Sequence, residues 1–547
     1  MATPASHPSF STDAPKRYAL LEDVPPRRAR LLWVTLQGLV NREGPELYCV
    51  SDSDFDEHWV EWYRGYGLEP DRLSQEEVLA RFLPKTSGAY VLDEEQAEWQ
   101  VPLGVTLAGL DDRVLVTAEQ ADAVAAHGVD VQPLPVPRFH RRFEAMVWGV
   151  QHLRPRTNPN LLHANFWIPR TDNLDICDWV VAERGFSYRL TTVPHKQPGE
   201  RELIEQIFDA TPPFSWVLGW HNKGEVECSY IDLPSRYGLV PFCTTRNLNF
   251  TFHRHVPAKS DHPWQQPPAP AAPELDPDKC YVTIVFSDGD APHSMIDLQK
   301  KQWNRPERGE FPFGWAIPPE MLTFGPAMLE YYYQTATPSD ELLCGPSGIG
   351  YCYLSHWGES RSDTADTTEL RREFYRRSNE LMERLDLRAM WPINRVVEWL
   401  PDGRMLRRIG GKDVWAINAD NEPDTYGVDF MDDRVMHEYC TQVPQARGFF
   451  QGWHNVPHES ERVMNGRPYF PGKVLAAKPD RALRDIERVA NAERRPGRPV
   501  FLPVHINCYP MDLAKVKEIY DGLDPDRYVV LTPTTFLELA VKARENA

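Results

Sequence analysis

From about residue 280 to the C-terminus, short apolar runs alternate with longer amphipathic segments. The runs are rich in β-branched and aromatic residues, and the segments between them place apolar residues three and four positions apart. The first pattern is typical of buried strands and the second of helices packed on a sheet. Their alternation predicts stacked β-α units. The eight expected strands are residues 281–286, 311–317, 343–353, 389–393, 414–417, 448–453, 500–506 and 528–531.

Eight such units predict that residues 280–547 close into a (β/α) barrel-like domain. A seven-stranded or partly open variant fits the same pattern, because residues 394–412 show little helical periodicity between the fourth and fifth strands.

The chain before residue 280 predicts two smaller α/β domains and a linker. Apolar helical and strand-like runs recur over residues 16–135 and again over residues 136–262. Residues 263–279, PWQQPPAPAAPELDPDK, are dense in proline, which denies the backbone both helix and ladder hydrogen bonds. We therefore expect an α/β protein in which a C-terminal barrel-like catalytic domain follows two smaller α/β domains.

Acidic residues follow two of the expected barrel strands. Asp288 and Asp290 follow the first strand in VFSDGD, and Asp420 and Glu422 follow the fifth in INADNEP. In a parallel barrel the carboxyl ends of the strands form one face, so these acids are expected across one pocket. Hydrolysis of a glycosidic bond uses such a pair, one carboxylic acid to protonate the leaving oxygen and one carboxylate as nucleophile or base. The alternative is structural, a turn at the first site and a helix cap at the second.

Aromatic and polar residues near the other strand ends are candidates for substrate binding. A flat aromatic ring covers the apolar face of a sugar, and imidazole or amide groups hydrogen-bond its hydroxyls. The aromatic rings also have an explanation as core side chains, and the histidines as structural ones. The predicted substrate-binding residues are Trp315, Tyr351, Tyr353, Asn394, Gln451, Trp453, His454 and His505.

The segment GPSGIGYCYLSHW at residues 345–357 resembles the GxGYxYP family, which is described as a family of glycoside hydrolases. SDGD at 287–290 is similar to the family's SDGDN segment, with Ala291 in place of the asparagine. TLQGLVNR at 35–42 and TLAGL at 106–110 are similar to segments of its N-terminal domains. The resemblance spans nearly the whole chain and implies a carbohydrate-active hydrolase. The motif positions are occupied by Gly348, Gly350, Tyr351 and Tyr353, with Leu354 in place of the final proline.

Two other functions fit the same residues. A metal-dependent polysaccharide or amide deacetylase presents adjacent acids after a strand and two histidines four positions apart, as His454 and His458 are. Here Ser287 stands in the first acidic place, and Pro457 disfavours a helix between the histidines. A non-catalytic carbohydrate-binding protein would keep the pocket without the chemistry.

The amino-acid composition limits the kinds of molecule that the protein is expected to bind. The net charge is −19, from 60 Lys and Arg against 79 Asp and Glu, which disfavours nucleic acid and anionic membranes as partners.

We find no apolar stretch of membrane-spanning length and no secretory signal pattern, and expect a cytoplasmic protein. Nine cysteines without a Cys-x-x-Cys pair predict neither a disulfide framework nor a zinc site. The expected ligand is a carbohydrate, without a cofactor or metal; the oligomeric state is not predicted.

Overall fold

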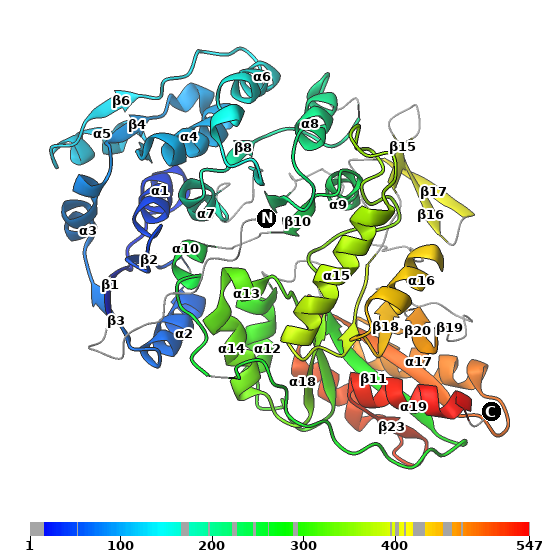
Figure 1. Cartoon of the computed structure of the whole chain (residues 1–547). Helices are drawn as coiled ribbons and strands as arrows, with labels where there is room; N and C mark the ends of the chain where they lie inside the picture. Colours follow the sequence, from blue (N-terminus) through cyan, green and yellow to red (C-terminus); the bar gives the residue numbers. More distant parts are fainter. Residues whose placement is uncertain are drawn as a thin grey trace. The chain divides into compact units, whose positions relative to one another are not determined.

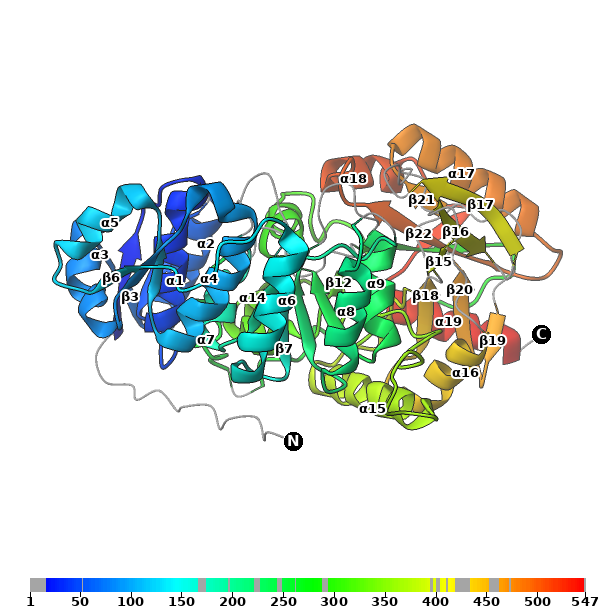
Figure 2. The ribbon, with the colours of Figure 1, turned by 90° about the horizontal axis from the view of Figure 1, so that it is seen from above.

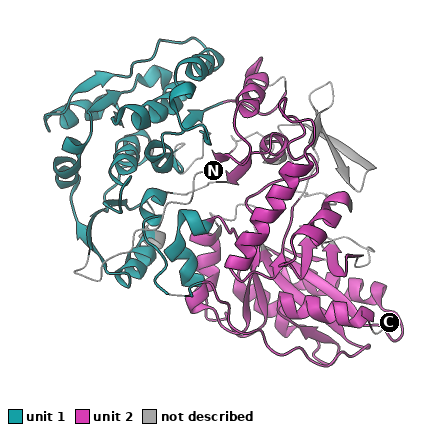
Figure 3. Ribbon diagram, viewed as in Figure 1, with its two compact units in different colours: residues 1–189, 246–263, 321–332 teal, residues 190–245, 264–320, 333–547 magenta. Residues whose placement is uncertain are grey.

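The protein is described here from a computed structural model (Figure 1), and its described parts form two compact units (Figure 3). Unit 1 comprises Met1–Arg189, Arg246–Pro263 and Met321–Tyr332, and unit 2 comprises Leu190–Thr245, Trp264–Glu320 and Tyr333–Ala547. Both contain helices and parallel strands, so the predicted α/β class is confirmed, whereas the predicted domain boundaries stay predictions. The described residues are 16–51, 53–165, 174–194, 197–220, 227–243, 248–260, 262–287, 294–393, 397–399, 404–409, 412–418, 433–451, 462–471 and 474–545.

Unit 1 contains short parallel sheets covered by helices. One sheet has the order β2-β1-β3 and another the order β5-β4-β6, while β7 pairs with β8. The strands are β1 (Lys16–Leu21), β2 (Leu47–Cys49), β3 (Leu68–Arg72), β4 (Ala89–Val91), β5 (Val114–Val116), β6 (Val131–Pro133), β7 (Leu161–Ala164) and β8 (Phe186–Tyr188). The helices are α1 (Leu31–Val40), α2 (Ser53–Arg64), α3 (Gln75–Phe82), α4 (Ala97–Asp111), α5 (Ala118–Ala125), α6 (Arg142–His152), α7 (Cys177–Ala182), α10 (Phe250–His253) and α13 (Met321–Phe324).

Helices α1 and α4 both pack closely against α7, and each does so through a glycine. A Cβ atom on Gly38 would stand 2.5 Å from the carbonyl oxygen of Asp178. A Cβ atom on Gly109 would stand 2.7 Å from the carbonyl oxygen of Val181. Any side chain at either position would overlap the α7 backbone, so the TLQGL and TLAGL segments need glycine for helix packing.

The described residues of unit 2 are built on a ten-stranded sheet, and among these strands only the β19–β20 pair is antiparallel. Its order is β19-β20-β18-β14-β13-β12-β11-β22-β21, and β23 also pairs with β11. The strands are β11 (Cys280–Ser287), β12 (Phe313–Ile317), β13 (Asp340–Cys344), β14 (Ala389–Met390), β18 (Gly448–Gln451), β19 (Arg462–Met464), β20 (Arg467–Pro471), β21 (Val474–Ala476), β22 (Val500–Asn507) and β23 (Tyr528–Val530).

Helices join these strands, and α17 packs against β21, β22 and α18 (Figure 2). A short parallel pair, β9 (Trp216–Gly219) and β10 (Val240–Cys243), also belongs to unit 2. The helices are α8 (Glu200–Asp209), α9 (Glu227–Arg236), α12 (Gln299–Trp303), α15 (Thr368–Arg384), α16 (Asp433–Gln442), α17 (Pro479–Glu493), α18 (Leu513–Asp521) and α19 (Pro533–Glu545), together with α14 (Pro326–Thr335), which begins in unit 1.

Seven of the eight expected strands lie in this sheet, and two details of the prediction are wrong. The third strand ends at Cys344, because the chain turns at Gly345 instead of continuing to Tyr353. The fifth expected strand lies in β17 (Lys412–Asn418), which pairs antiparallel with β16 (Arg404–Ile409) in a separate sheet completed by β15 (Val397–Trp399). An apolar run such as VWAI fits either kind of sheet, so its pattern alone did not distinguish them.

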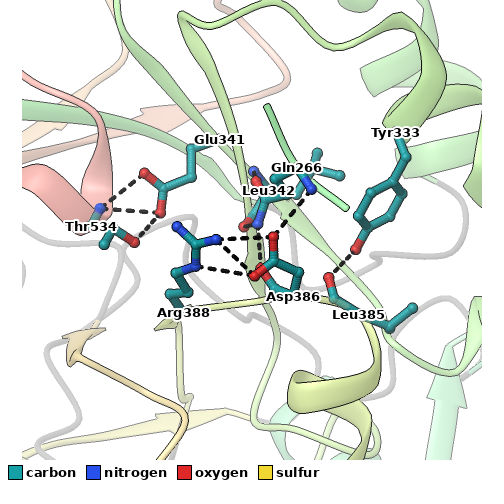
Figure 4. A network of polar contacts seen from close by, with 8 residues as sticks. All are labelled: Gln266, Tyr333, Glu341, Leu342, Leu385, Asp386, Arg388 and Thr534. Carbon is teal, nitrogen blue, oxygen red and sulfur yellow. Dashed lines mark hydrogen bonds and ion pairs between the residues drawn. The ribbon is translucent and has the colours of Figure 1, made fainter. Parts of the chain in front are cut away.

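The proline-rich segment forms neither helix nor strand, as predicted, but it is tied to the sheet through Gln266. The Gln266 side chain accepts a hydrogen bond from the Leu342 amide (2.6 Å) and donates one to the Leu342 carbonyl (3.0 Å). It also donates to the carbonyl of Asp386 (2.7 Å), whose carboxylate pairs with Arg388 (Figure 4). These contacts fix the segment to the start of β13.

Candidate functional site

The carboxyl ends of the central strands of unit 2 meet at one edge of the sheet. Ser287 at the end of β11 pairs with Asn507 at the end of β22, and Ile317 at the end of β12 pairs with Cys344. In a parallel sheet this edge is where side chains from several strands can reach one ligand. Several predicted site residues lie outside the described residues: Asp288, Asp290, Asn394, Asp420, Glu422, Trp453 and His454, together with the side chain of Gln451.

The loop after β13, residues 345–353, is called the motif loop below. Its Ser347 hydroxyl donates a hydrogen bond to the Ile393 carbonyl (2.9 Å) and accepts one from the Ile393 amide (3.0 Å). The Ser347 carbonyl accepts a hydrogen bond from the Tyr439 hydroxyl (2.7 Å). The motif loop is therefore held against the exit of β14 and against α16, and its backbone is rigidly placed at the edge.

Tyr351 and Tyr353 contact each other in the motif loop, with ring centroids 5.8 Å apart at 81°. They are only 4% and 1% exposed, and the backbone amide of Tyr353 donates a hydrogen bond to Ser235 of α9 (3.1 Å). The loop is not a strand, although a strand was expected over residues 343–353. A role of these two rings in substrate binding stays a prediction.

His505, two residues before the end of β22, is fully buried, and neither ring nitrogen has a hydrogen-bond partner among the described residues. Burial lowers its pKa to about 4, so the ring is neutral near pH 7. Its backbone pairs in register with Val285 of β11, which places both side chains on the same face of the sheet. A buried imidazole with two unused nitrogens is uncommon and is consistent with contact to a ligand or to water.

Trp315 lies on the opposite face of the sheet from Val285. A Cβ atom on Gly314 would touch Val285, so these two residues face the same side of the sheet, and Trp315, the next residue along the strand, faces the other side. There Trp315 packs against Trp303 of α12, with ring centroids 5.1 Å apart. The Trp315 indole nitrogen donates to Asp340 (2.9 Å) and no part of the ring is exposed. These are the contacts of a core side chain, and they do not support the predicted role of Trp315 in binding a sugar.

The structure adds a residue that the sequence analysis passed over, Glu320, the third residue after β12. It is 5% exposed, and its Oε2 atom has no hydrogen-bond partner in the described part of the chain. Burial raises its pKa to about 8. Burial and, second to it, the Glu320 carboxylate raise the pKa of the thiols of Cys344 and Cys352 well above their ordinary value. Glu320 follows the second expected strand, residues 311–317, so the rule that acids after strand ends are candidate site residues would also have selected it.

Comparison with known protein families gives three matches along the chain, all to one family. Residues 18–82 match the "GxGYxYP_N 1st domain", residues 167–255 the "GxGYxYP third domain", and residues 278–541 the "GxGYxYP putative glycoside hydrolase C-terminal domain". The chain belongs to the GxGYxYP family. The last of the three matched ranges coincides with the ten-stranded sheet of unit 2.

Among solved structures, the GxGYxYP chain is similar to one titled "a putative hydrolase" from Bacteroides thetaiotaomicron, with 16% identity over 97% of this chain and 95% of that chain and a TM-score of 0.75. At this identity the likeness shows the fold. A second structure, titled a "putative polysaccharide deacetylase" from Mycobacterium smegmatis, has 14% identity over 51% of this chain and 96% of that chain; its TM-score of 0.28 carries no argument. None of the curated proteins matches the chain.

The first glycine of the GxGYxYP motif is required by packing. Gly348 has φ +116°, and a Cβ atom there would stand 2.3 Å from the hydroxyl oxygen of Ser378 on α15. Backbone conformation and crowding thus both exclude a larger residue. The motif glycine therefore lets the loop lie directly on α15.

Among the described residues, no three His, Cys, Asp or Glu side chains gather closely enough to hold a metal ion. Nor does a helix within the described ranges combine the length and apolarity needed to cross a bilayer.

Proposed function

We propose that this protein hydrolyses glycosidic bonds, at a site on the carboxyl edge of the unit 2 sheet. The observation that carries the proposal is the match of residues 278–541 to the C-terminal domain of a family described as glycoside hydrolases. Those residues form a sheet whose central strands end at one edge, and such edges are where α/β enzymes bind ligands.

The strand pairing supports a closed barrel as part of this proposal. β20 pairs parallel with β18, and β21 pairs parallel with β22 at the far end of the same sheet. Only residues 472–473 separate β20 from β21 in the sequence, so consecutive strands pair with both ends of the sheet. A barrel of seven strand positions, with β20 and β21 sharing one of them, accounts for this pairing and would surround the carboxyl edge with loops.

One of Asp288 and Asp290 is proposed to act together with one of Asp420 and Glu422 as the two catalytic carboxyls. The first pair directly follows Ser287, the last residue of the central strand β11. The second pair follows β17, which lies in the separate antiparallel sheet, so the strand-exit argument supports the first pair alone. The sugar is proposed to contact Tyr351, Tyr353, His505 and the other predicted binding residues of this edge.

The test compares wild type with Asp288→Asn, Asp290→Asn and Glu422→Gln on a panel of aryl glycosides and oligosaccharides. Loss of a catalytic carboxyl is expected to lower turnover by about 1,000-fold or more without a change in melting temperature. Asp122→Asn, an exposed acid on α5, is the control and should keep wild-type activity. Wild-type rates in the three variants would rule out this assignment. Binding of glycans without any turnover would indicate a carbohydrate-binding protein instead.

A further inference from the structure

We propose that Glu320, in place of Asp420 or Glu422, is the general acid of the site, the carboxylic acid that protonates the departing glycosidic oxygen. The inference rests on the proposed glycosidase function and names the residue that supplies the proton. Its basis is the position of Glu320 at the carboxyl edge, its burial, and the absence of a partner for its Oε2 atom among the described residues.

Glu320 follows the end of β12, at the carboxyl edge of the unit 2 sheet. Ile317 ends β12 and pairs with Cys344, the last residue of β13. Glu320 follows Ile317 after two prolines, which limit the backbone conformations available to this exit. Glu320 is therefore attached to a strand whose end lies at the carboxyl edge of the sheet, three residues beyond that end.

The Glu320 side chain is buried, and its Oε2 atom has no hydrogen-bond partner among the described residues. Native proteins rarely leave a buried carboxyl oxygen without a hydrogen bond, because the lost hydration costs about 1–3 kcal/mol or more. Glu341, a buried acid at the start of β13, shows the usual solution, since its carboxyl accepts hydrogen bonds from the amide of Thr534 at 2.9 and 3.1 Å (Figure 4). Glu320 has no such contact for Oε2 among the described residues, so a bound ligand is the natural acceptor for its proton.

The surroundings keep this acid protonated near neutral pH. Within the described ranges, Glu320 acts on the thiols of Cys344 and Cys352, whose raised pKa keeps them uncharged. No described cation shifts the pKa of Glu320; burial raises it to about 8, opposed by a hydrogen bond from its own backbone. A carboxylic acid with this pKa holds its proton at pH 7 and releases it to a stronger base, as a general acid must.

The chemistry balances without a cofactor. As the bond between the anomeric carbon and the glycosidic oxygen breaks, the Glu320 proton passes to that oxygen and the leaving group departs as an alcohol. Water supplies the hydroxyl on the sugar and gives its proton to the opposing carboxylate, or to Glu320 itself if a covalent intermediate is hydrolysed. One water is consumed, and Glu320 is protonated again before the next turnover.

The first experiment uses Glu320→Gln, which keeps the shape of the side chain and removes the acid. With alkyl or sugar leaving groups, which require protonation, kcat/KM should fall by about 100-fold to 10,000-fold. With dinitrophenyl glycosides, whose leaving group departs as a stable anion, it should fall less than about 10-fold. The basic limb of the wild-type pH profile should also be lost. Glu341→Gln is the matched control: another buried acid, at the opposite end of β13, that should leave the leaving-group dependence unchanged.

The second experiment needs no substrate. The infrared difference spectrum between wild type and Glu320→Gln at pH 7 should contain the carbonyl stretch of a buried protonated carboxylic acid. An ionised Glu320 in that spectrum overturns the proposal, as does equal loss of activity toward good and poor leaving groups. If wild type cleaves no glycoside at all, the proposed function itself fails, a result distinct from either of these.

Discussion

The side-chain oxygen of Thr35 in α1 accepts a hydrogen bond from the backbone amide of Leu115 in β5, 3.0 Å away. The relationship is repeated further along unit 1, where Thr106 in α4 accepts from the amide of Ser187 in β8 at 2.9 Å. Each threonine begins a similar segment, TLQGL or TLAGL, so one local design ties two helices to two successive sheets.

Replacing either threonine by valine should destabilise unit 1. The shape is kept, but a buried strand amide loses its acceptor, which costs about 1–3 kcal/mol. Denaturant unfolding of Thr35→Val and Thr106→Val should show this loss in the free energy of unfolding. Thr35→Ser and Thr106→Ser retain the hydroxyl and should recover most of it; equal losses in the serine and valine variants would contradict the hydrogen-bond explanation.

A second prediction concerns the glycine before the motif tyrosines. A Cβ atom on Gly350 would stand 2.4 Å from a Cγ atom of Val240 in β10. Gly350→Ala should therefore destabilise the protein by about 1–3 kcal/mol through overpacking. Combining it with Val240→Ala, which removes the opposing methyl groups, should cost less than the sum of the two single variants. Simple additivity, measured by thermal unfolding, would show that the glycine is needed for another reason.

The sequence located the strands of unit 2 well because its central strands are continuous apolar runs. β11 and β22 each have parallel neighbours on both sides, and their described side chains are all buried, so their hydrophobicity has no polar alternation and is easily seen. β17 also contains a continuous apolar run, but it pairs antiparallel with β16 in a separate sheet. The Gly410-Gly411 pair between the two runs of RRIGGKDVW is a hairpin signal that would have predicted its antiparallel pairing.

The site was less predictable, since burial and partners come from distant parts of the chain. Trp315 appeared at a strand end, yet its indole is enclosed by Trp303 and Asp340. Glu320 was not among the predicted site residues, because its burial cannot be seen in the sequence around it. Gly348 of the family motif is explained by its packing against α15.

A third prediction concerns the start of the C-terminal helix. The Glu341 carboxyl accepts hydrogen bonds from the amide and hydroxyl of Thr534, in the first turn of α19 (Figure 4). Glu341→Gln should lower the free energy of unfolding by about 1–2 kcal/mol, because one acceptor becomes a donor facing a donor. A double-mutant cycle with Thr534→Ala should give a coupling free energy of about 1 kcal/mol. A coupling near zero would show that the two residues stabilise the protein independently.

The last prediction uses the buried neutral state of His505. Its pKa is lowered by burial from 6.5 in the unfolded chain to about 4 in the folded protein, so below pH 6.5 the unfolded state binds the additional proton. Stability should therefore fall as pH decreases from about 6.5 to 4, and this histidine alone contributes a loss of about 3 kcal/mol over that window.

His505→Phe removes the titration and should flatten the curve of unfolding free energy against pH by that amount, while His437→Gln, exposed on α16, should parallel wild type. Because His163 and His253 also have pKa values lowered by burial, the His505→Phe curve should keep a residual slope. A curve for His505→Phe that coincides with wild type would mean that His505 takes up its proton equally in the folded and unfolded chain, and that its ring nitrogens are reached by water.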